Sequence, residues 1–364
     1  MIKEFKKSII GQINQSTGLK KKLLWLFDFY IKYRPFVVGA FVRNPAYILH
    51  VFSSKVIARP GTLSFGGIFN PGALQINSEI MLLANGQKVP WFKARGKKKE
   101  FYLQGNPVVL TLPNSSQKVM KEHVIHELMN IPKDQDYALE DFRLFWWKGK
   151  MMCNHSLVIR KIYDDFIGQT GSRSALSVLD IKKNTLHFCG VPNVDFPLQK
   201  FEKNWVYKET EKDLLMFYSV SPFRVLKLEN EEKLSFKTVI NQNVSNQLKD
   251  PGGFGTLVSF STNPIDYDEK HWFCVIHQIQ HKITGRCYYH WAILISKETW
   301  MPTSITSKPI FSGNGARGRL PGIRYISSVL KIEEELLFFA GEGDVYVTLT
   351  KRKRKEMEKL FVNI

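Results

Sequence analysis

The spacing of apolar residues changes between residues 45 and 64. In residues 1–45, lysines alternate with aliphatic and aromatic residues at a spacing that predicts one or two amphipathic helices with a basic face. From about Ser64 onward, short runs rich in Val, Ile, Phe, Tyr and Trp alternate with Gly, Pro, Asn and Asp turns, which predicts strands. The sequence therefore predicts an all-β domain over residues 60–350, behind a basic helical segment and before a basic tail at residues 351–364.

Five segments within the predicted β domain share one plan. In each, a charged turn leads into a strongly apolar strand that ends in small or polar residues; the segments are 77–85, 148–155, 211–219, 269–277 and 333–341. They start roughly 60 to 70 residues apart, a period compatible with four-stranded propeller blades that carry long loops. We therefore predict a five-bladed β-propeller, with a β-sandwich or two sheet domains as the alternative. If the segments are innermost strands, their closing polar residues meet at the central channel.

Residues 138–157 predict a β-hairpin with polar residues at both ends. Glu140 and Asp141 stand just before Arg143, an apolar strand follows, and a Lys-Gly-Lys turn leads into a strand with Asn154 and His155. Adjacent strand residues point to opposite faces, so Glu140 and Asp141 are not automatically a two-carboxylate glycosidase pair. The alternative is a solvated turn with Arg143 in a surface ion pair.

Composition favours an anionic partner. The chain of 364 residues carries a formal net charge of +19, and nucleic acid, an acidic membrane surface and a phosphorylated substrate all fit that charge. Nucleic acid is disfavoured because no recognised nucleic-acid-binding motif is present. The four cysteines are scattered without a Cys-x-x-Cys pair, so we expect buried free thiols and a cytoplasmic protein. No apolar stretch is long enough for a transmembrane helix.

Four motifs in residues 62–350 resemble, in order, those of a known family. They are Phe69-Asn70-Pro71-Gly72-Ala73, Glu140-Asp141-Phe142-Arg143, Trp272-Phe273-Cys274-Val275-Ile276-His277 (followed by Tyr288-Tyr289-His290) and Phe339-Ala340-Gly341-Glu342-Gly343-Asp344. The pattern resembles the five-bladed β-propellers of the inverting β-mannoside phosphorylases, the related β-1,2-mannosyltransferases and neighbouring propeller glycosyltransferases. The resemblance implies that Asp141 is the catalytic acid, that His277 contacts phosphate and that Asp344 holds the sugar.

The chain also departs from the family pattern. Phe142 stands where the family usually has proline, and Asn85 stands where a phosphate-binding arginine normally closes the first repeat. Lys203 and Arg224 match the basic positions of the middle blades only loosely. These departures argue against inorganic phosphate as a co-substrate more than they argue against the fold.

Together, the residues and the resemblance predict an enzyme that transfers a sugar with inversion. Asp141 would exchange a proton with the attacking hydroxyl or the departing oxygen. The expected substrate-binding residues are Asn70, Glu140, Arg143, Asn154, His155, Tyr289, His290 and Asp344, and the expected donor-binding residues are Lys203, Asn204, Arg224, His277 and Arg286. A phosphate or diphosphate needs several such donors at once. Neither a metal nor a cofactor is expected.

The expected partners are a carbohydrate acceptor and a nucleotide sugar or sugar phosphate donor. The basic ends favour a glycosyltransferase with a membrane-linked acceptor, working at the inner face of the membrane. For residues 1–45, the alternative is a helix packed on the main domain. For the whole protein, the alternatives are a β-mannoside phosphorylase or glycoside hydrolase, and a glycan-binding propeller without catalysis.

Overall fold

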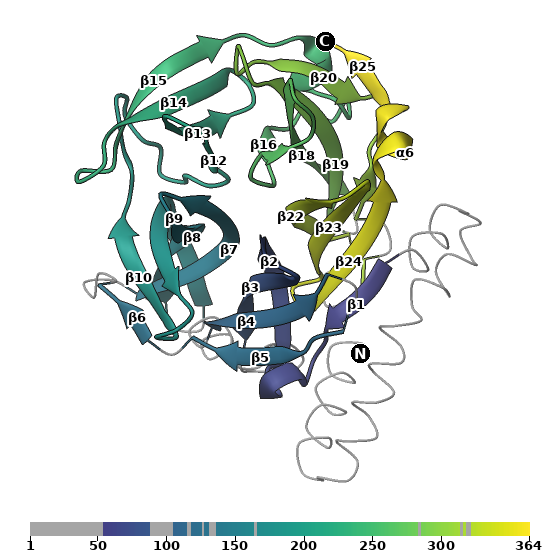
Figure 1. Cartoon of the computed structure of the whole chain (residues 1–364). Coiled ribbons are helices and arrows are strands. Elements are labelled where there is room, and N and C mark those ends of the chain that lie inside the picture. The colour runs from purple at the N-terminus through teal and green to yellow at the C-terminus, as the bar shows by residue number, and fades with distance from the viewer. Residues whose placement is uncertain are drawn as a thin grey trace, which may run out of the picture.

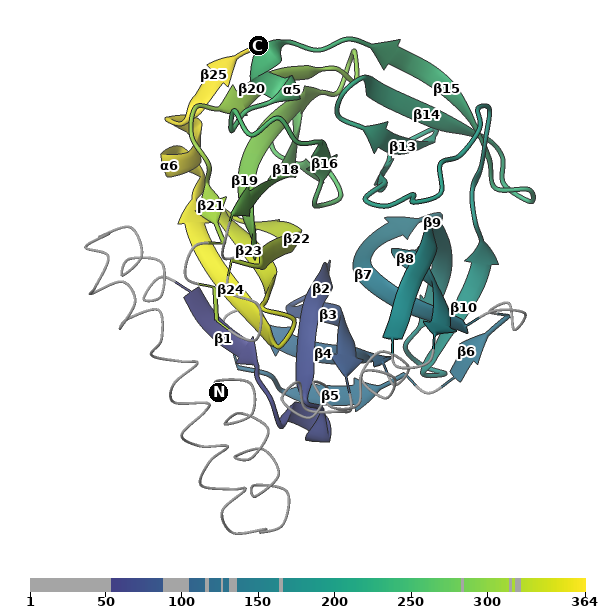
Figure 2. The same ribbon diagram turned by 180° about the vertical axis from the view of Figure 1, so that it is seen from behind.

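Short strands joined by tight turns make up most of the chain in the computed structural model. It describes residues 54–87, 105–114, 118–125, 127–130, 136–163, 166–282, 285–313, 316–317 and 322–364. The strands of this part of the chain form five sheets, which surround a common centre in Figure 1 and, seen from behind, in Figure 2. The predicted all-β class is confirmed. The predicted helical segment, residues 1–45, lies outside the described residues.

Sheets 1 to 3 are built from strands that follow one another along the chain. Sheet 1 contains β2 (Gly67–Ile76), β3 (Glu79–Gln87), β4 (Gly105–Pro113) and β5 (Lys121–Val124). Sheet 2 contains β7 (Asp136–Trp147), β8 (Lys150–Tyr163), β9 (Phe166–Asp180), β10 (Thr185–Gly190) and, parallel to β10, β6 (Glu127–Met129). Sheet 3 contains β12 (Val206–Glu209), β13 (Leu214–Ser219), β14 (Phe223–Asn230), β15 (Ser235–Gln242) and, parallel to β15, β11 (Asn193–Val194).

Sheets 4 and 5 each include one strand that is distant in sequence from the others, β25 (Phe361–Asn363) in sheet 4 and β1 (Ser54–Ala58) in sheet 5. Sheet 4 contains β16 (Val258–Phe260), β17 (Ile265–Asp266), β18 (His271–Lys282), β19 (Gly285–Ser296), β20 (Pro302–Thr306), β21 (Phe311–Ser312) and β25. Sheet 5 contains β22 (Arg324–Ile332), β23 (Glu335–Glu342), β24 (Tyr346–Lys353) and β1. The helices described are the short η1 (Thr62–Ser64), α5 (Asn246–Lys249) and α6 (Arg354–Glu358).

The hydrophobic core is divided among the interfaces between neighbouring sheets. Five clusters of buried apolar residues lie between sheets 1 and 2, 2 and 3, 3 and 4, 4 and 5, and 5 and 1. Trp205 and Trp291 are each 1% exposed, and burying an aromatic side chain of this kind contributes about 3 kcal/mol. Both faces of each sheet are therefore covered, which explains why the strands appear in the sequence as apolar runs rather than as strict alternation.

The five repeated segments correspond to the second strands of the five sheets. They overlap β3, β8, β13, β18 and β23, each of which lies between the first strand of its sheet and a third one. The expectation that these segments are innermost strands was wrong, because β2, β7, β12, β16 and β22 precede them and lie at the inner edge (Figure 1). Their closing residues therefore lie behind the first strands, and not all of them meet at the centre.

Both ends of the described chain pair with strands that are distant in sequence. β1 pairs with β24, so residues near position 54 complete sheet 5. Residues 351–364, expected as a basic tail, include the end of β24, α6 and β25, and β25 pairs with β20. Among the described residues, no helix is long and apolar enough to cross a membrane.

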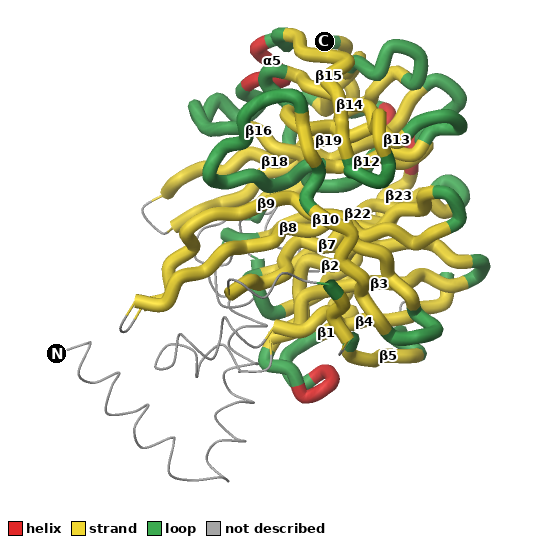
Figure 3. Tube along the Cα trace, turned by 90° about the vertical axis from the view of Figure 1, so that its left-hand side faces the viewer, coloured by secondary structure: helices red, strands yellow, loops and turns green. Residues whose placement is uncertain are grey.

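Among the hairpins that join the second and third strands of a sheet, two are longer than the others. β8 and β9 have 14 and 15 residues, and β18 and β19 have 12 residues each. Their far ends extend on one side of the ring (Figure 3). Of the four cysteines, Cys153, Cys274 and Cys287 are buried as expected, whereas Cys189 near the end of β10 is exposed.

Candidate active site

Asn70 of β2 and Asp141 of β7 meet between sheets 1 and 2. Asn70 Nδ2 donates a hydrogen bond of 2.8 Å to Asp141 Oδ1. Both backbones are left-handed, with φ of 50° and 59°, and both residues lie where a β-bulge shifts the strand register. Asn and Asp tolerate this conformation better than most residues, and a bulge can re-aim a side chain. Glu140 and Asp141 were predicted to point to opposite faces because side chains alternate along a regular strand. The bulge interrupts that alternation at these two residues.

Two glycines allow the strands around Asn70 to approach closely. A Cβ atom on Gly341 of β23 would lie 2.0 Å from Asn70 Oδ1. A Cβ atom on Gly72 of β2 would lie 2.8 Å from the carbonyl oxygen of Phe142. Neither distance is compatible with a side chain, so the Asn-Pro-Gly motif, the Glu-Asp-Phe-Arg motif and the last motif pack together here.

Arg143 is buried at the convergence of four sheets. Its side chain is 1% exposed. Nε donates to the Ser261 carbonyl oxygen at 2.6 Å, and Nη1 donates to the Asp141 carbonyl oxygen at 3.1 Å. Nη2 donates to Asn204 Oδ1 at 3.2 Å and to the Tyr325 hydroxyl group. All these acceptors are uncharged, and within the described chain Arg143 forms no ion pair with a carboxylate. The site therefore contains a buried cation without a paired anion.

His277 of β18 lies beside this cation as a neutral group. Its Nδ1 is 2.9 Å from Ser261 Oγ, and its ring packs edge-on against Tyr325 with centroids 5.2 Å apart. Burial, reinforced by the charge of Arg143, lowers the pKa of His277 to about 3. His277 therefore acts as an uncharged hydrogen-bonding group near neutral pH, and not as an imidazolium that would attract phosphate.

His290 and Tyr288 of β19 share a face with His277. His277 pairs directly with His290 across the two strands, and the ring of Tyr288 is stacked 5.6 Å from that of His277. His290 Nε2 accepts a hydrogen bond of 3.2 Å from the Ile326 amide. Tyr289 pairs with Gln278 on the opposite face and packs against Phe254. The structure therefore brings Tyr288, and not the predicted Tyr289, to the centre.

Tyr288 connects the centre to two further predicted residues. Burial raises the pKa of Tyr288 to about 12, with further increases from the charges of Asp141 and Asp344, and the Arg286 side chain opposes these effects by hydrogen bonding to it. Asp344, with a φ of 57°, lies in the turn between β23 and β24. Asp141, Asp344 and Arg286 therefore all lie near one tyrosine.

Asn154 and His155 of β8 lie behind the first strand and support the sheet. Asn154 Nδ2 donates to the Trp205 carbonyl oxygen at 2.9 Å, and His155 Nε2 lies 2.9 Å from Ser177 Oγ. The ring of His155 packs 5.8 Å from that of Phe142, and burial lowers the pKa of His155 to about 4. Glu140 is half-buried and pairs with Ser156 in the strand ladder.

The predicted donor-binding residues of sheet 3 are only partly at the centre. Asn204, with a φ of 64°, contacts Arg143 and Tyr325. Lys203 is the half-buried residue before it. The Arg224 guanidinium group stacks 4.2 Å from the centre of the Phe196 ring, and Nε reaches Asn241 at 3.4 Å. Among the described contacts, none joins Arg224 to Asp141, Arg143 or His277.

Sequence reasoning missed three central residues, Tyr288, Ser261 and Tyr325. Ser261 follows the short strand β16 in a polar Ser-Thr-Asn sequence, which was a usable signal. Tyr325 lies near the start of an apolar strand, and nothing in its neighbourhood distinguishes it from a core tyrosine. Its central position results from the arrangement of the five sheets around a common centre. From sheet 5, Tyr325 reaches residues of sheets 2, 3 and 4.

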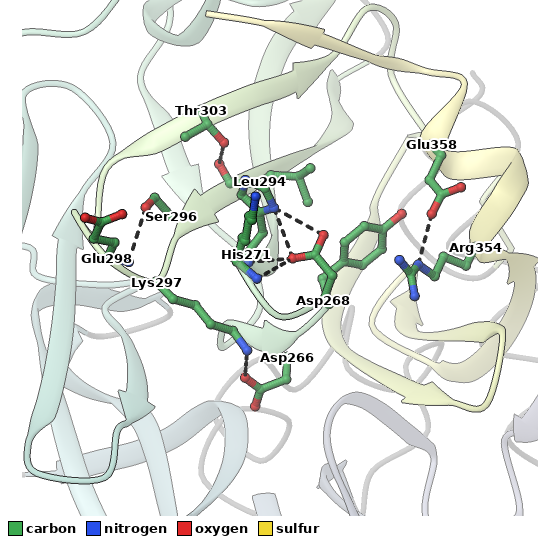
Figure 4. Close-up of polar contacts among 12 residues, drawn as sticks. Asp266, Asp268, His271, Leu294, Ser296, Lys297, Glu298, Thr303, Arg354 and Glu358 are labelled. Carbon is green, nitrogen blue, oxygen red and sulfur yellow. Dashed lines mark hydrogen bonds and ion pairs between the residues drawn. The ribbon is translucent and has the colours of Figure 1, made fainter.

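The opposite end of sheet 4 has a different kind of polar cluster (Figure 4). The Asp268 carboxylate accepts hydrogen bonds from the His271 backbone at 2.6 Å and ring at 3.0 Å, and Lys297 pairs with Asp266 at 2.8 Å. His271 lies six residues from His277 along β18, or about 20 Å in an extended strand. Among the described residues, no cluster of His, Cys, Asp and Glu has the arrangement of a metal site.

Comparison with known proteins identifies the fold. No protein-family model matches the sequence, and no curated protein matches it. Solved structures do match. The β-1,2-mannobiose phosphorylase of Listeria innocua has a TM-score of 0.55 at 14% identity, over 85% of this chain and 93% of that one. A GDP-Man-dependent mannosyltransferase of Leishmania mexicana has a TM-score of 0.56 at 12% identity, over 82% and 88%.

A third similar structure comes from work on glycoside hydrolases of the GH130 family that target β-1,2 mannosidic linkages. It has a TM-score of 0.58 at 11% identity, over 82% of this chain and 86% of that one. Likeness at such low identity shows the fold alone. The chain therefore has the fold of the β-mannoside phosphorylases and mannosyltransferases that its motifs resemble.

Proposed function

We propose that the protein is an inverting glycosyltransferase that moves a mannose-like sugar from an anionic activated donor to a glycan or lipid-linked acceptor. The observation that carries the proposal is the Asn70–Asp141 pair beside the buried Arg143. Asn70 engages Asp141 Oδ1, and among the described residues none hydrogen-bonds Oδ2. That oxygen is available to exchange a proton with a sugar hydroxyl.

In the proposed reaction, Asp141 accepts the proton of the acceptor hydroxyl as its oxygen attacks the anomeric carbon. The bond from that carbon to the donor phosphate oxygen breaks on the opposite face, and the phosphate leaves with the bonding electrons. One acting carboxylate is enough because the leaving group is already an anion, whereas inverting hydrolysis needs a second carboxyl group to activate water. Asp344 would bind sugar hydroxyls, and Arg286, His277 and Tyr288 would contact the leaving group.

We further propose that the five sheets act as the blades of a five-bladed propeller, with the substrates entering on the face of the long hairpins. Asn70 lies near the start of β2 and Asp344 lies in the turn before β24, and both positions are at the same end of their sheets as the β18–β19 turn. In a propeller, such ends converge on one face.

The runner-up is a β-mannoside phosphorylase or hydrolase, because such enzymes share this fold. A phosphorylase needs cationic side chains for free phosphate. Asn85 offers no charge where the resemblance places an arginine, and its side chain is only 5% exposed. This difference favours the transferase.

The test is donor consumption by the purified full chain. It would be incubated with GDP-mannose or mannose 1-phosphate together with manno-oligosaccharide acceptors, and separately with β-1,2-mannobiose and phosphate. We expect consumption of an activated donor with formation of an inverted linkage. Release of mannose 1-phosphate from mannobiose would establish the phosphorylase instead. Sugar binding without turnover under all conditions, unchanged in Asp141→Asn, would establish a binding protein.

The lipid-linked acceptor is tested separately. The full chain would be sedimented with vesicles of anionic phospholipid and with neutral vesicles, with and without residues 1–45. Binding to anionic vesicles alone, lost on truncation, supports an acceptor at a membrane. Equal recovery with both vesicle types would favour a soluble glycan acceptor.

A further inference from the structure

Tyr325 lies at the centre of the ring and contacts residues from several sheets through both its hydroxyl group and its aromatic ring. Its side chain comes from β22 of sheet 5 and is 5% exposed. Its hydroxyl group accepts a hydrogen bond from Arg143 Nη2 of sheet 2 and donates one of 3.1 Å to Asn204 Oδ1, at the start of sheet 3. Its ring contacts His277 and Tyr288 of sheet 4, with centroids 5.2 and 6.0 Å away. One phenol therefore contacts residues from three other sheets.

The three polar groups form a closed triangle. Arg143 Nη2 donates to both Tyr325 and Asn204, and Tyr325 donates to the same Asn204 oxygen. The tyrosine hydroxyl thus uses its proton on Asn204 and its lone pair on Arg143. Burial raises the pKa of Tyr325 well above its ordinary value, so the phenol keeps this proton at neutral pH and the direction of the hydrogen bonds is fixed.

The triangle determines the orientation of Arg143, and Arg143 contacts the backbone of Asp141. Nη1 donates to the Asp141 carbonyl oxygen within the bulge, where the backbone is left-handed. A left-handed non-glycine residue is maintained only when its surroundings hold it. Arg143 supplies one of these interactions, and Asn70 supplies another through the carboxylate.

We propose that Tyr325 is a positioning residue for sugar transfer, acting through Arg143 on the geometry of Asp141. This inference rests on the proposed function. It also reassigns Arg143: every nitrogen of its guanidinium group already donates to a protein acceptor, so its role is to hold the catalytic bulge and not to grip the donor.

Tyr325→Phe tests the proposal, because it keeps the ring and removes only the hydroxyl group. With the activated donor that the wild type consumes, we expect kcat to fall about tenfold while KM changes less than about threefold, since misplacement of a reacting group lowers the rate more than binding. In the Asp141→Asn background, Tyr325→Phe should have no further effect on kcat. Tyr267→Phe is the matched control, because Tyr267 is also a buried tyrosine of a sheet interface, 2% exposed, near the opposite end of β18.

Several outcomes would overturn the proposal: wild-type kcat in Tyr325→Phe, an equal loss in Tyr267→Phe, or an undiminished tenfold loss in the Asp141→Asn background. A KM increase without a kcat change would make Tyr325 a substrate ligand.

A second readout separates this inference from the proposed function. Tyr325→Phe and Arg143→Lys would be combined in a double-mutant cycle of urea unfolding, which needs no substrate. Coupled effects on unfolding are expected if the two residues form one unit. If the wild type consumes none of the donors tested, the proposed function fails. Independently of that result, additive effects on unfolding in the cycle would show that Arg143 and Tyr325 do not act as one unit.

Discussion

The two ends of β18 place charged and polar groups in opposite ways. At one end, the buried His277 is neutral and lies beside Arg143, whose cation is surrounded by uncharged acceptors. At the other end, Asp268 pairs with His271, and Asp266 pairs with two lysines at a surface where its side chain is 63% exposed. Balanced surface charges contribute little to stability. A buried charge without an oppositely charged partner lowers the stability of the folded protein. Such unfavourable arrangements are typical of functional sites, so this end of β18 has the properties of one.

The largest expected difference between these two regions is in catalysis. Asp141→Asn keeps the side-chain volume and removes the proton acceptor, so kcat should fall by about 10² to 10⁴. The measurement is the initial rate of donor consumption. Asp266→Asn, a matched change at the other end of the sheet, should leave the rate unchanged. Full activity in Asp141→Asn would remove the catalytic assignment.

A loss by a factor of about 10 to 100 in kcat is expected for Gly341→Ala. The new Cβ atom would lie 2.0 Å from Asn70 Oδ1 and must displace the side chain that holds Asp141. Asn70→Ala is the companion variant. If Gly341→Ala acts through Asn70, the double variant should lose no more activity than the worse single variant. Additive losses would show that Gly341 acts elsewhere.

The buried histidines predict acid sensitivity. Burial lowers the pKa of His155 to about 4 and that of His277 to about 3, and it also holds the pKa of His290 well below its ordinary value. An unfolded histidine has a pKa of about 6.5, so the unfolded chain binds more protons below that pH and the free energy of unfolding falls as pH falls from about 6.5 towards the folded values. Each such histidine contributes a slope of about 1.4 kcal/mol per pH unit.

Urea unfolding at pH 7.5, 6.0 and 5.0 measures this slope. His277→Gln should reduce it by the share of one histidine. The same change at His281, which is exposed near the end of β18, is the matched control for the substitution itself. An unaltered slope in His277→Gln would mean that His277 is protonated in the folded protein.

The smallest effect is expected at the ion-paired end. Burial alone would raise the pKa of Asp266, but hydrogen bonds from Lys208 and Lys297 outweigh it and lower the pKa below its ordinary value. Its stabilising effect is therefore present above the unfolded pKa and is lost as pH falls through the lower folded pKa. Asp266→Asn should cost less than about 1 kcal/mol at pH 7, and less still in 1 M salt. A larger cost would make this cluster a structural centre.

Much of the fold could be predicted from the sequence because its signals are local. The five repeated segments begin at turns and are filled with apolar residues, and each overlaps the second strand of a sheet. Whether a segment is innermost depends on the strand beside it, which local periodicity does not reveal. The hairpin at residues 138–157 was predicted for the same local reason, and Lys148 and Gly149 in its turn have the positive φ angles of a tight hairpin turn.

The candidate site could be predicted only where a motif identified a residue. Asn70 and Asp141 carry motifs and lie together. Tyr289 was predicted from the sequence, whereas the neighbouring Tyr288 lies at the centre. Which of the two tyrosines faces the centre depends on the pairing of His277 with His290, and the sequence does not specify that pairing. Tyr325 has no local signal, because its partners are 182 and 121 residues away.

The pairing of β1 with β24 has a consequence for synthesis of the chain. Ser54 lies opposite Thr350, so the first described strand leaves the ribosome long before its partner exists. Until β24 has been synthesised, the backbone groups of β1 have no partner in sheet 5. Contacts between residues so distant in sequence also form slowly. Synthesis of β24, and not the folding of any single sheet, therefore sets the earliest moment at which sheet 5 can be completed.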